Sequence, residues 1–369
     1  SMFVARDATL HFRNLALLGG TVSEGGPIVT VKGADVRFRH VTMTGGDGVD
    51  AGAVFVSTRG DVSFVDSLVL ANRASEGAGA VEARGGMTAL RTSFVANVGE
   101  RGGAVAGNID GLHNVTFSRN RARTQGGAYW STGPFAVSNV TIAGNRARRG
   151  GAVAASPDLR QGLGFADHVI VAGNRTSFGG QCRGTFASGG WNVEDGRSCG
   201  FDRPSDRSRT DPLLGALTSN GGPTPTMALR SGSPAIDVGG DCVAHDQRGA
   251  PRGRCDAGAY ERVLCAGRAV DIVGTRGDDD LSGGREPDTF LGLGGDDFFQ
   301  GSLADDIACG GRGDDVLWGG PDDDALRGGH GNDRLDGEGG VDRCVGGPGR
   351  DRLRACEVQR TSRRRPGGA

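Results

Sequence analysis

Nine aspartates recur at every ninth position near the carboxyl end of the chain. They are Asp279, Asp288, Asp297, Asp306, Asp315, Asp324, Asp333, Asp342 and Asp351. Each is the sixth residue of a nonapeptide that begins with glycine, and the eighth residue is apolar or small. A hard cation such as Ca²⁺ takes about six to eight oxygen ligands from carboxylates and backbone carbonyls, and glycine-rich turns expose such carbonyls. The spacing therefore predicts an array of calcium sites with these aspartates as metal ligands.

Three of the nonapeptides, GGRGDDVLW, GGHGNDRLD and GGPGRDRLR, follow the pattern GGxGxDxUx closely. The nine units in phase, from Gly274 to Arg354, resemble the calcium-binding repeats of haemolysin-type, repeats-in-toxin proteins. This resemblance implies a parallel β-roll in which each nonapeptide forms half a coil, with Ca²⁺ bound between turns two repeats apart. The structural period is then twice the sequence repeat, and one coil contains two nonapeptides.

The fourth residue of the nonapeptide divides the repeats into two rows. The odd repeats all have glycine there, at Gly277, Gly295, Gly313, Gly331 and Gly349. The even repeats have Glu286, Ala304, Asp322 and Gly340. If this position requires positive φ, the odd row is intact and the even row is strained or altered. The aspartates of the odd row are therefore the preferred ligands and frame up to four sites, whereas those of the even row frame up to three poorer ones.

Charge is distributed unevenly along the chain. Residues 274–354 contain 19 acidic side chains and nine arginines, whereas the rest of the chain has 33 basic and 25 acidic side chains. The acidic charges would repel one another in a compact roll, so we expect Ca²⁺ to drive its folding and a chelator to unfold it. The alternative for this region is a solvated, disordered acidic tail.

A second repeat occupies the first half of the chain. Seven segments place an apolar residue at nearly regular steps, at Leu17, Met43, Val69, Phe94, Phe117, Ile142 and Val171. Short β-branched runs such as DVSFV and FAVSNVTI lie between them and indicate strands. A unit of about 24 residues suits one coil of a parallel β-solenoid with three short strands. In the later units an asparagine follows, and we expect a structural ladder of stacked amides at Asn72, Asn97, Asn120, Asn145 and Asn174.

Two further resemblances concern this body. The FxxN and GGA-type motifs of residues 10–182 resemble the polymorphic outer-membrane protein repeats of right-handed β-helix surface proteins. The segment 211–261, which begins DPLLGALTSNGGPTPTMALRSGSPAID, resembles the choice-of-anchor Q domain that ends many bacterial secreted β-helix proteins. Its prolines, Pro223, Pro225 and Pro234, forbid helix and deny ladder hydrogen bonds. We therefore expect a turn-rich cap over the last coil, where it protects the open end of the solenoid.

These patterns predict an all-β protein, a right-handed parallel β-helix followed by a calcium-binding parallel β-roll. The expected domains are the β-helix at 1–200, a proline-rich cap at 201–264, the roll of nine nonapeptides at 265–357 and a disordered basic tail at 358–369. No apolar run approaches the length of about 20 residues that a transmembrane helix needs. No nucleic-acid-binding motif is visible. We expect a monomer.

Eight cysteines, all from Cys182 onward, bear on the cellular compartment. An even number without CxxC pairs predicts disulfides and export to the extracellular space or cell surface, with a reduced cytosolic chain as the alternative. Proximity favours the pairs Cys182–Cys199, Cys242–Cys255 and Cys344–Cys356, which leaves Cys265 for Cys309. No signal peptide is visible, and Ser1-Met2 resembles a cloning remnant, so we expect a truncated N-terminus.

Four arginines offer a binding surface on the β-helix. Arg73, Arg121, Arg146 and Arg175 each follow a ladder asparagine, so we expect them to stack on one face. Such a strip either binds an anionic polysaccharide or cell-surface polymer, or forms a solvated edge that discourages aggregation.

We identify no catalytic residues. A polysaccharide lyase or epimerase needs a base beside the sugar C5 proton and a cation or arginine beside the carboxylate, and no compact cluster of this kind stands out. Asp167 with His168, and His245 with Asp246 and Arg248, are interpreted as structural. The sequence therefore favours a scaffold or adhesion role, with a polysaccharide lyase or epimerase acting on acidic glycans as the alternative.

Overall fold

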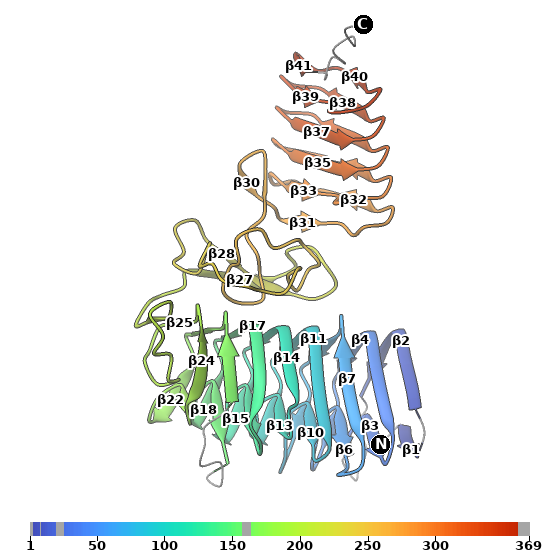
Figure 1. Cartoon of the computed structure of the whole chain (residues 1–369). Coiled ribbons are helices and arrows are strands. Elements are labelled where there is room, and N and C mark those ends of the chain that lie inside the picture. Colours follow the sequence, from blue (N-terminus) through green and yellow to red (C-terminus); the bar gives the residue numbers. More distant parts are fainter. Residues whose placement is uncertain (1–2, 8, 20–25, 157–163, 361–369) are drawn as a thin grey trace, which may run out of the picture. The chain divides into compact units, whose positions relative to one another are not determined.

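The computed structural model describes residues 3–7, 9–19, 26–156 and 164–360, and its regular elements within these residues are all strands. It separates into two compact units (Figure 1). The first comprises Ser1–Ser219 with Pro223–Glu261, and the second comprises Asn220–Gly222 with Arg262–Ala369. The expected all-β fold class is confirmed.

The first unit is a parallel β-solenoid of about seven turns, built from three sheets. Sheet A pairs, in this order, β1 (Phe3–Arg6), β3 (Val29–Lys32), β6 (Val54–Val56), β10 (Val81–Ala83), β13 (Val105–Gly107), β16 (Tyr129–Ser131), β19 (Val153–Ala155) and β23 (Cys182–Arg183). Sheet C pairs β22 (Arg175–Phe178), β18 (Arg146–Arg149), β15 (Arg121–Gln125), β12 (Val98–Arg101), β9 (Arg73–Ala74) and β5 (Asp47–Gly48).

Sheet B is the largest sheet of the solenoid, with twelve strands. They are β2 (Thr9–Leu18), β4 (Asp35–Thr44), β7 (Asp61–Val65), β8 (Leu68–Leu70), β11 (Gly86–Val95), β14 (Gly111–Ser118), β17 (Phe135–Ala143), β20 (Gly164–Asp167), β21 (Ile170–Ala172), β24 (Phe186–Gly190), β25 (Val193–Glu194) and β26 (Arg207–Ser208). A residue with left-handed backbone bends the long strands near their middle, for example Asn114 in β14 with a φ of 51°.

The predicted apolar column forms the core of the solenoid. Strand pairing places its seven members in one register from Leu17 to Val171, and all are buried. Aromatic rings stack along the same interior, as in the pair Phe94 and Phe117 with centroids 5.0 Å apart. The periodic apolar residues therefore stabilise the coils as the sequence predicted.

The asparagine ladder is buried and hydrogen-bonded from coil to coil. Nδ2 of Asn120 donates to Oδ1 of Asn145 at 2.9 Å and to the carbonyl of Phe94 at 2.8 Å. The backbone N–H of Asn120 donates to the same Oδ1 at 3.0 Å. Beyond Asn174 the ladder ends on Oε1 of Gln181. The structural interpretation of these asparagines is confirmed.

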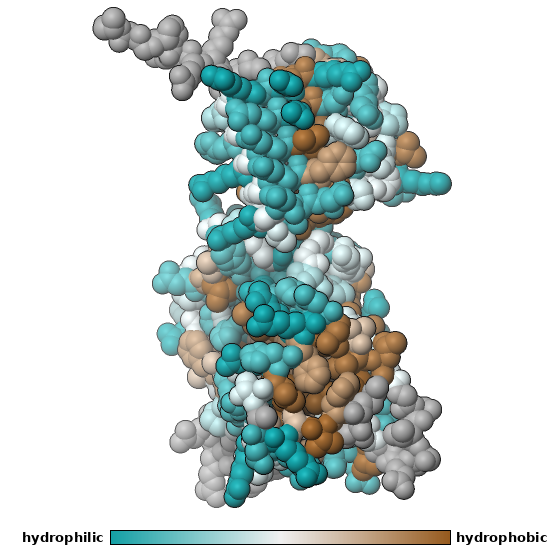
Figure 2. All heavy atoms as spheres, turned by 90° about the vertical axis from the view of Figure 1, so that its right-hand side faces the viewer, coloured by the Kyte–Doolittle hydropathy of each residue, from teal (hydrophilic) through white to brown (hydrophobic). Residues whose placement is uncertain are grey.

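The first coil leaves apolar side chains exposed. Phe3, Leu10 and Leu18 are exposed by 41%, 37% and 62%, respectively. Figure 2 views the molecule from this side and shows an apolar area on the solenoid, whereas the surface of the roll is largely hydrophilic. Within the described residues, no strand covers the outer edges of β1 and β2.

The proline-rich segment lies elsewhere than expected. It contains one antiparallel pair, β27 (Leu214–Thr218) and β28 (Thr226–Leu229). Instead of only covering the last coil, it runs along the outer face of sheet B. Oγ of Ser93 donates to the carbonyl of Pro225 at 2.6 Å, and Oγ1 of Thr116 donates to Oε1 of Gln247 at 2.7 Å. The reason is that successive coils present a column of outward hydroxyl groups, which need partners when they are buried.

A small apolar cluster joins the same segment to the last coils. Leu229, Ala235, Ala257 and Tyr260 pack with residues of β21 and β25, which include Ile170. The segment therefore extends across several coils and contacts the last ones as part of a longer interface.

The second unit is a roll of two parallel sheets, preceded by the hairpin β29 (Leu264–Cys265) and β30 (Arg268–Ala269). Sheet D pairs β31 (Ile272–Val273), β33 (Thr289–Leu291), β35 (Ile307–Arg312), β37 (Ala325–His330), β39 (Arg343–Val345) and β41 (Val358–Arg360). Sheet E pairs β32 (Asp280–Ser282), β34 (Phe298–Gln300), β36 (Val316–Gly320), β38 (Arg334–Glu338) and β40 (Arg352–Arg354).

Consecutive nonapeptides alternate between the two sheets of the roll. Leu317 of sheet E pairs with Leu335, and Ala308 of sheet D pairs with Leu326, so the register advances by two nonapeptides per coil. The side chains at position eight fill the interior between the sheets, with Phe290 and Phe299 in contact at its first coils. Half a coil per nonapeptide is the arrangement that the resemblance implied.

All four predicted disulfides are present. Cys182–Cys199 and Cys242–Cys255 lie in the first unit, and Cys265–Cys309 and Cys344–Cys356 lie in the second. Among the described residues no helix is long and apolar enough to cross a membrane.

Candidate calcium-binding array

The nine aspartates line two sides of the roll, where the turns before each strand stack. The odd row contains Asp279, Asp297, Asp315, Asp333 and Asp351. In this row the backbone N–H of each of the first four aspartates donates to Oδ1 of the aspartate one coil later, at 3.0, 2.9, 3.0 and 3.2 Å. The even row contains Asp288, Asp306, Asp324 and Asp342. Its corresponding distances are 2.7, 2.7 and 2.8 Å.

The second carboxylate oxygen of the interior aspartates has no partner. Oδ2 is buried without a hydrogen bond in Asp297, Asp306, Asp315, Asp324, Asp333 and Asp342, each at most 3% exposed. The end members Asp279, Asp288 and Asp351 are half-buried. An unpaired buried carboxylate oxygen is costly, so a group of six in two regular rows points to a missing positive partner.

The first glycine of each nonapeptide makes room for an oxygen cage. A Cβ atom added to Gly292 would lie 2.1 Å from Oδ2 of Asp297 and 2.4 Å from the carbonyl oxygen of Gly310 in the next coil. At Gly301 the corresponding distances are 2.4 Å to Oδ2 of Asp306 and 2.1 Å to the carbonyl oxygen of Gly319. A carboxylate oxygen and a carbonyl oxygen from two stacked turns thus converge on one place.

Main-chain oxygens have to complete the ligand set. The described part of the chain contains no group of three or more histidine, cysteine, aspartate or glutamate side chains that could hold a metal by themselves. A site of few carboxylates and many carbonyls suits Ca²⁺, whereas zinc and other transition metals favour imidazole and thiolate. The residues therefore fit Ca²⁺, which the aspartate Oδ2 atoms and the glycine carbonyls would hold.

Burial raises the pKa of the interior aspartates. The pKa is raised to about 7 in Asp315 and Asp324 and to about 6 in Asp297, Asp306 and Asp333. Loss of solvent is the largest cause, and carboxylates of neighbouring coils raise the pKa further, while hydrogen bonds from backbone N–H groups oppose the shift. Ionising these groups thus costs more free energy in the folded roll than in the unfolded chain, and a bound cation would offset that cost.

The comparison with protein families agrees with this geometry. The family model of the RTX calcium-binding nonapeptide repeat (4 copies) matches residues 273–308, 300–333 and 318–353. Residues 273–353 are RTX calcium-binding repeats. Their cofactor is Ca²⁺. No curated protein and no solved structure matches the chain significantly, and no match supports the two resemblances noted for the β-helix and the proline-rich segment.

The backbone distinguishes the two rows of RTX repeats. Position four is left-handed in Gly295, Gly313 and Gly331, with φ of 109°, 127° and 142°. In the even row Ala304 and Asp322 are held at φ of 76° and 84°. Left-handed backbone strains residues that carry a Cβ, so the even row bears the strain that the sequence predicted at this position.

Position two is also left-handed, which the sequence reasoning missed. Leu293, Ser302 and Glu338 have φ of 81°, 88° and 67° at this position. Gly311, Gly320, Gly329 and Gly347, with φ between 111° and 124°, occupy it in other repeats. The recurrence of glycine as the second residue was the signal for this turn. One strained residue falls in the odd row and two fall in the even row, so the difference between the rows persists.

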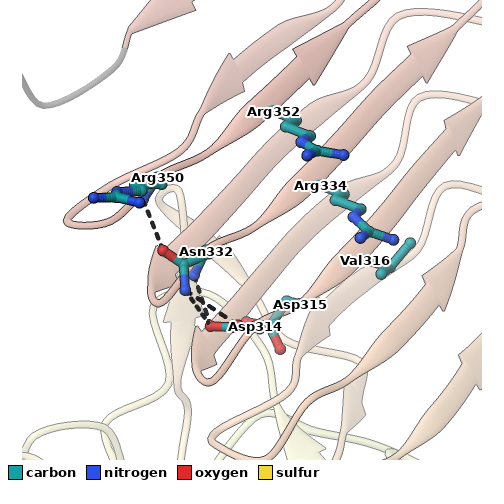
Figure 3. Close-up of a pocket in the computed structure, with 7 residues that line it drawn as sticks. All are labelled: Asp314, Asp315, Val316, Asn332, Arg334, Arg350 and Arg352. Atoms are coloured by element: carbon teal, nitrogen blue, oxygen red, sulfur yellow. Dashed lines mark hydrogen bonds between the residues drawn. The ribbon is translucent and has the colours of Figure 1, made fainter.

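A third ladder on the outside of the roll was likewise not predicted. The backbone N–H of Asp314 donates to Oδ1 of Asp296 at 2.8 Å, and Asn332 continues the ladder onto Asp314. These hydrogen bonds from Asn332 hold the pKa of Asp314 below its ordinary value. Beside it lies a depression of about 620 Å³, which Arg334 and Arg352 also line (Figure 3). Acidic and basic side chains therefore line the depression together, with Asp315 of the odd row among them.

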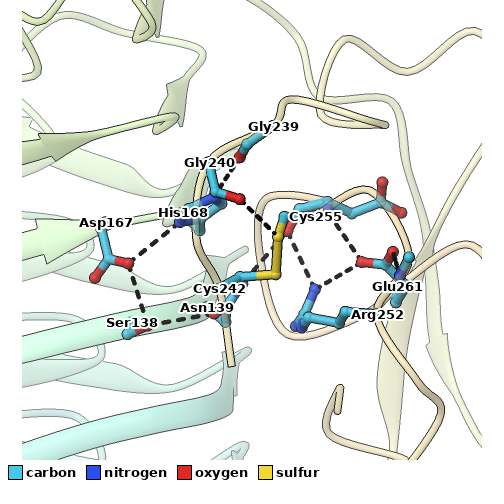
Figure 4. Close-up of a disulfide and its surroundings, with 12 residues drawn as sticks. Ser138, Asn139, Asp167, His168, Gly239, Gly240, Cys242, Arg252, Cys255 and Glu261 are labelled. Carbon is cyan, nitrogen blue, oxygen red and sulfur yellow. Dashed lines mark hydrogen bonds and ion pairs between the residues drawn. A yellow bond between two sulfur atoms is a disulfide. The ribbon is translucent and has the colours of Figure 1, made fainter. Parts of the chain in front are cut away.

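Side chains of both groups that the sequence analysis interpreted as structural are buried in the first unit. His168 is fully buried, and its Nε2 lies 2.7 Å from the carbonyl of Gly239 (Figure 4). Its ring stacks on Trp191. In the other group Asp246 and Arg248 form a buried ion pair at 2.8 Å. The pair has no solvent-facing surface with which to act on a substrate.

One acidic group with arginine neighbours stands out on sheet A. Glu82 in β10 is half-buried, and burial raises its pKa to about 7, while Arg84 and Arg101 act in the opposite direction. Arg84 lies over the ring of Phe55 at 4.9 Å, and Arg101 lies over the ring of Trp130 at 4.9 Å. The sequence reasoning missed this group because Arg101 comes from β12 of the neighbouring coil and no motif joins it to Glu82 and Arg84.

Proposed function

We propose that this protein is an extracellular or cell-surface scaffold with an adhesion role, in which Ca²⁺ folds the RTX roll and the β-solenoid binds an anionic polysaccharide. The observation that carries the proposal is the group of six buried Oδ2 atoms without partners, since it couples the folded roll to a cation that is abundant outside cells. Four disulfides suit an oxidising compartment, and RTX repeats are typical of secreted proteins.

The binding part of the proposal rests on an arginine column in sheet C. Arg121, Arg146 and Arg175 occupy one register position on β15, β18 and β22, and Val98 separates them from Arg73 in the same column. All four arginines are exposed, and none takes part in an ion pair among the described residues.

Neighbouring arginines are engaged differently. Arg123 forms an ion pair with Glu100 at 2.9 Å, and Arg148 lies over the ring of Phe178 at 5.1 Å. In the part of the chain that the structure describes, the four column arginines take part in no such ion pair or ring contact. Adjacent strands lie about 4.8 Å apart, so the column repeats a positive charge at a regular spacing. A polymer with an anionic group on successive sugars complements such a row better than a single small anion does.

A triple substitution tests the binding proposal. Arg121→Ala, Arg146→Ala and Arg175→Ala together should weaken binding to immobilised polygalacturonate at least about tenfold at low salt, because three of the charges that attract the polymer are lost. Binding of the unchanged protein should also fall as salt is added. Binding that is absent, or unaffected by both salt and the substitution, would contradict the proposal.

The matched control removes the same charge from another face. Arg13→Ala, Arg37→Ala and Arg39→Ala replace three exposed arginines of β2 and β4 in sheet B. This variant should retain most of the binding. An equal loss in both variants would mean that net charge, and not the column, is responsible.

A polysaccharide lyase or epimerase is the second candidate function, and Glu82 is the observation that favours it. A carboxylate with a pKa of about 7 suits a general base, and Arg84 or Arg101 can neutralise a sugar carboxylate. In a lyase reaction Glu82 would take the C5 proton while the C4–O bond breaks, the departing oxygen taking a proton from water. Polygalacturonate incubated with the protein would then yield unsaturated uronates that absorb ultraviolet light, and Glu82→Gln would abolish them. Absence of product, together with unchanged sugar stereochemistry, would remove this candidate.

A further inference from the structure

Residues 355–357 lie beyond the last nonapeptide and beyond residue 353, where the RTX family match ends. The even row continues into this segment. In the preceding coil the N–H of Asp324 donates to Oδ1 of Asp342, which is 18 residues later. The N–H of Asp342 donates instead to Oε2 of Glu357 at 2.5 Å, 15 residues later. Glu357 therefore occupies the place of the next aspartate in the row.

Ala355 supplies the carbonyl that the missing repeat would have supplied. A Cβ added to Gly337 would lie 2.1 Å from the carbonyl oxygen of Ala355 and 2.2 Å from Oδ2 of Asp342. In an ordinary even-row turn, the atoms nearest a Cβ on Gly301 are the carbonyl oxygen of Gly319 and Oδ2 of Asp306. Gly319 is the first residue of the nonapeptide one coil later, so Ala355 takes the place of such a glycine. Ala355 reaches this position with a left-handed backbone, at a φ of 47°.

Asp342 points to a ligand in this place. Its side chain is 1% exposed, and its Oδ2 atom is buried without a hydrogen-bond partner. Within the described residues, neither Asp342 nor Glu357 belongs to an ion pair. Oδ2 of Asp342 and the carbonyl oxygen of Ala355 thus converge beside Gly337, and the Glu357 carboxylate lies at hydrogen-bond distance from the N–H of Asp342. Oxygen ligands of this kind are those that Ca²⁺ prefers.

A disulfide closes the shortened coil. Cys356, which stands between Ala355 and Glu357, is bonded to Cys344 of β39. The N–H of Glu357 also donates to the carbonyl of Asp342 at 3.0 Å. The covalent bond and this hydrogen bond hold three residues outside the repeat pattern against the last even-row turn.

We propose that Asp342, Glu357 and the carbonyl of Ala355 form a further Ca²⁺ site at the end of the even row, held in place by the Cys344–Cys356 disulfide. Two of its three ligands, Glu357 and the carbonyl of Ala355, lie outside the nine nonapeptides. It rests on Ca²⁺ binding by the RTX roll, which is part of the proposed function, and it adds a ligand that the repeat motif does not contain. Because the disulfide holds Glu357 in place, Ca²⁺ binding at this site should depend on whether Cys344 and Cys356 are oxidised.

Calorimetric titration of the full chain with Ca²⁺ tests this proposal. Glu357→Gln keeps an oxygen that can accept the hydrogen bond from Asp342 but removes the charge. This variant should bind one Ca²⁺ fewer per chain than the unchanged protein, or bind one Ca²⁺ at least about tenfold more weakly, while the other sites are retained. Glu76→Gln removes an exposed carboxylate of the solenoid and should leave the titration unchanged.

A double substitution, Cys344→Ser with Cys356→Ser, tests the role of the disulfide. It should remove the same site, and Ca²⁺-bound protein should show faster hydrogen exchange only around residues 337–357. Equal stoichiometry and affinity in Glu357→Gln and in the unchanged protein would overturn the terminal site while leaving the RTX sites standing. If the unchanged protein binds no Ca²⁺, both the terminal site and the proposed function fail. Hydrogen exchange also shows whether the whole roll has unfolded in either variant. Unfolding of the whole roll in the Glu357→Gln variant at saturating Ca²⁺ would also contradict a purely local site.

Discussion

The N–H of Asp279 donates a 3.0 Å hydrogen bond to Oδ1 of Asp297 in the next coil, while Oδ2 of Asp297 is buried without a partner. One carboxylate therefore has two uses. Its Oδ1 atom fixes the stacking of neighbouring turns, and its Oδ2 atom faces the place where glycine carbonyls converge. Stacking the coils thus buries carboxylates that need neutralising, which supports the proposal that folding of the RTX roll and binding of Ca²⁺ are coupled.

Removal of Ca²⁺ should unfold the roll and leave the solenoid intact. The roll has a narrow apolar core and two rows of buried carboxylates, whereas the solenoid has a continuous core and the asparagine ladder. A site with a Kd of about 0.1 mM in about 1 mM Ca²⁺ contributes about 1.4 kcal/mol, so several sites decide the stability of the roll. Hydrogen exchange in excess chelator should increase for residues 289–345 and stay slow for residues 81–143.

Added Ca²⁺ should restore the protection, and Mg²⁺ at the same concentration serves as the control because it demands a smaller, more regular ligand cage. Equal protection of the roll with and without chelator would show that its carboxylates are stabilised in another way.

The Ca²⁺-free roll should become less stable as pH rises. The interior aspartates have a folded pKa of about 6 to 7, above the ordinary value of 3.8, so the folded roll binds protons more tightly than the unfolded chain. Their contribution to stability is full below about pH 4 and is lost as pH rises through about 7. Thermal unfolding in Ca²⁺-free buffer should give a lower melting temperature for the roll at pH 8 than at pH 5.

Saturating Ca²⁺ should remove or reverse this trend, because bound Ca²⁺ requires the ionised carboxylates and binding releases protons. A Ca²⁺-free roll that is more stable at pH 8 than at pH 5 would contradict the pKa directions.

The odd row should contribute more to Ca²⁺ affinity than the even row. Asp315→Asn and Asp324→Asn each remove one carboxylate from the centre of a row. The turns of the odd row are less strained, so we expect its sites to bind Ca²⁺ more tightly. Asp315→Asn should therefore lower the Ca²⁺ affinity of the tighter phase by roughly tenfold, whereas Asp324→Asn should lower the affinity of the weaker phase. Calorimetric titration separates the two phases. Indistinguishable effects would mean that the backbone difference has no consequence for affinity.

The roll was largely predictable because its repeat places a ligand, a turn and a core residue at fixed positions. Position eight forms the core, as expected. Position six, which was predicted to supply metal ligands, also forms two hydrogen-bonded ladders that the sequence did not predict. The left-handed backbone at position two was not predicted. Four glycines with left-handed backbone occupy this position, but Leu293 and Ser302 occupy it in other repeats, so the preference for glycine is not visible in every unit. Glu357 was not predictable, because a shortened coil and a disulfide, and no repeat motif, bring it to Asp342.

The solenoid shows the same division between local pattern and long-range contact. Its apolar column and asparagine ladder follow from a repeat of about 24 residues. The course of the proline-rich segment depends on pairs such as Thr116 with Gln247, which are 131 residues apart and share no motif. Proline positions excluded helix there, but they carry no information about which face of the solenoid supplies hydrogen-bond partners.

Ala304→Gly should stabilise the even row. Ala304 is held at a φ of 76°, a conformation that costs an L-residue roughly 1 kcal/mol relative to glycine. The roll should therefore gain up to about 1 kcal/mol in the free energy of unfolding, less the added entropy of the unfolded chain. Gly313→Ala is the converse variant, since its Cβ would lie 2.0 Å from the carbonyl oxygen of Gly295 and should destabilise the roll strongly. Urea denaturation in saturating Ca²⁺ measures both, and a less stable Ala304→Gly would contradict the strain argument.

Asn120→Ala should destabilise the solenoid far more than a substitution at the next residue. The change leaves the carbonyl of Phe94 and the N–H of Asn97 buried without their present partner. Each such group costs about 1–3 kcal/mol, so the free energy of unfolding should fall by about 2–5 kcal/mol. Arg121→Ala is the control, because its side chain is exposed and its loss should change stability by no more than about 0.5 kcal/mol. Urea denaturation followed by circular dichroism in saturating Ca²⁺ distinguishes them, and equal small effects would mean that water or a shifted backbone replaces the amide.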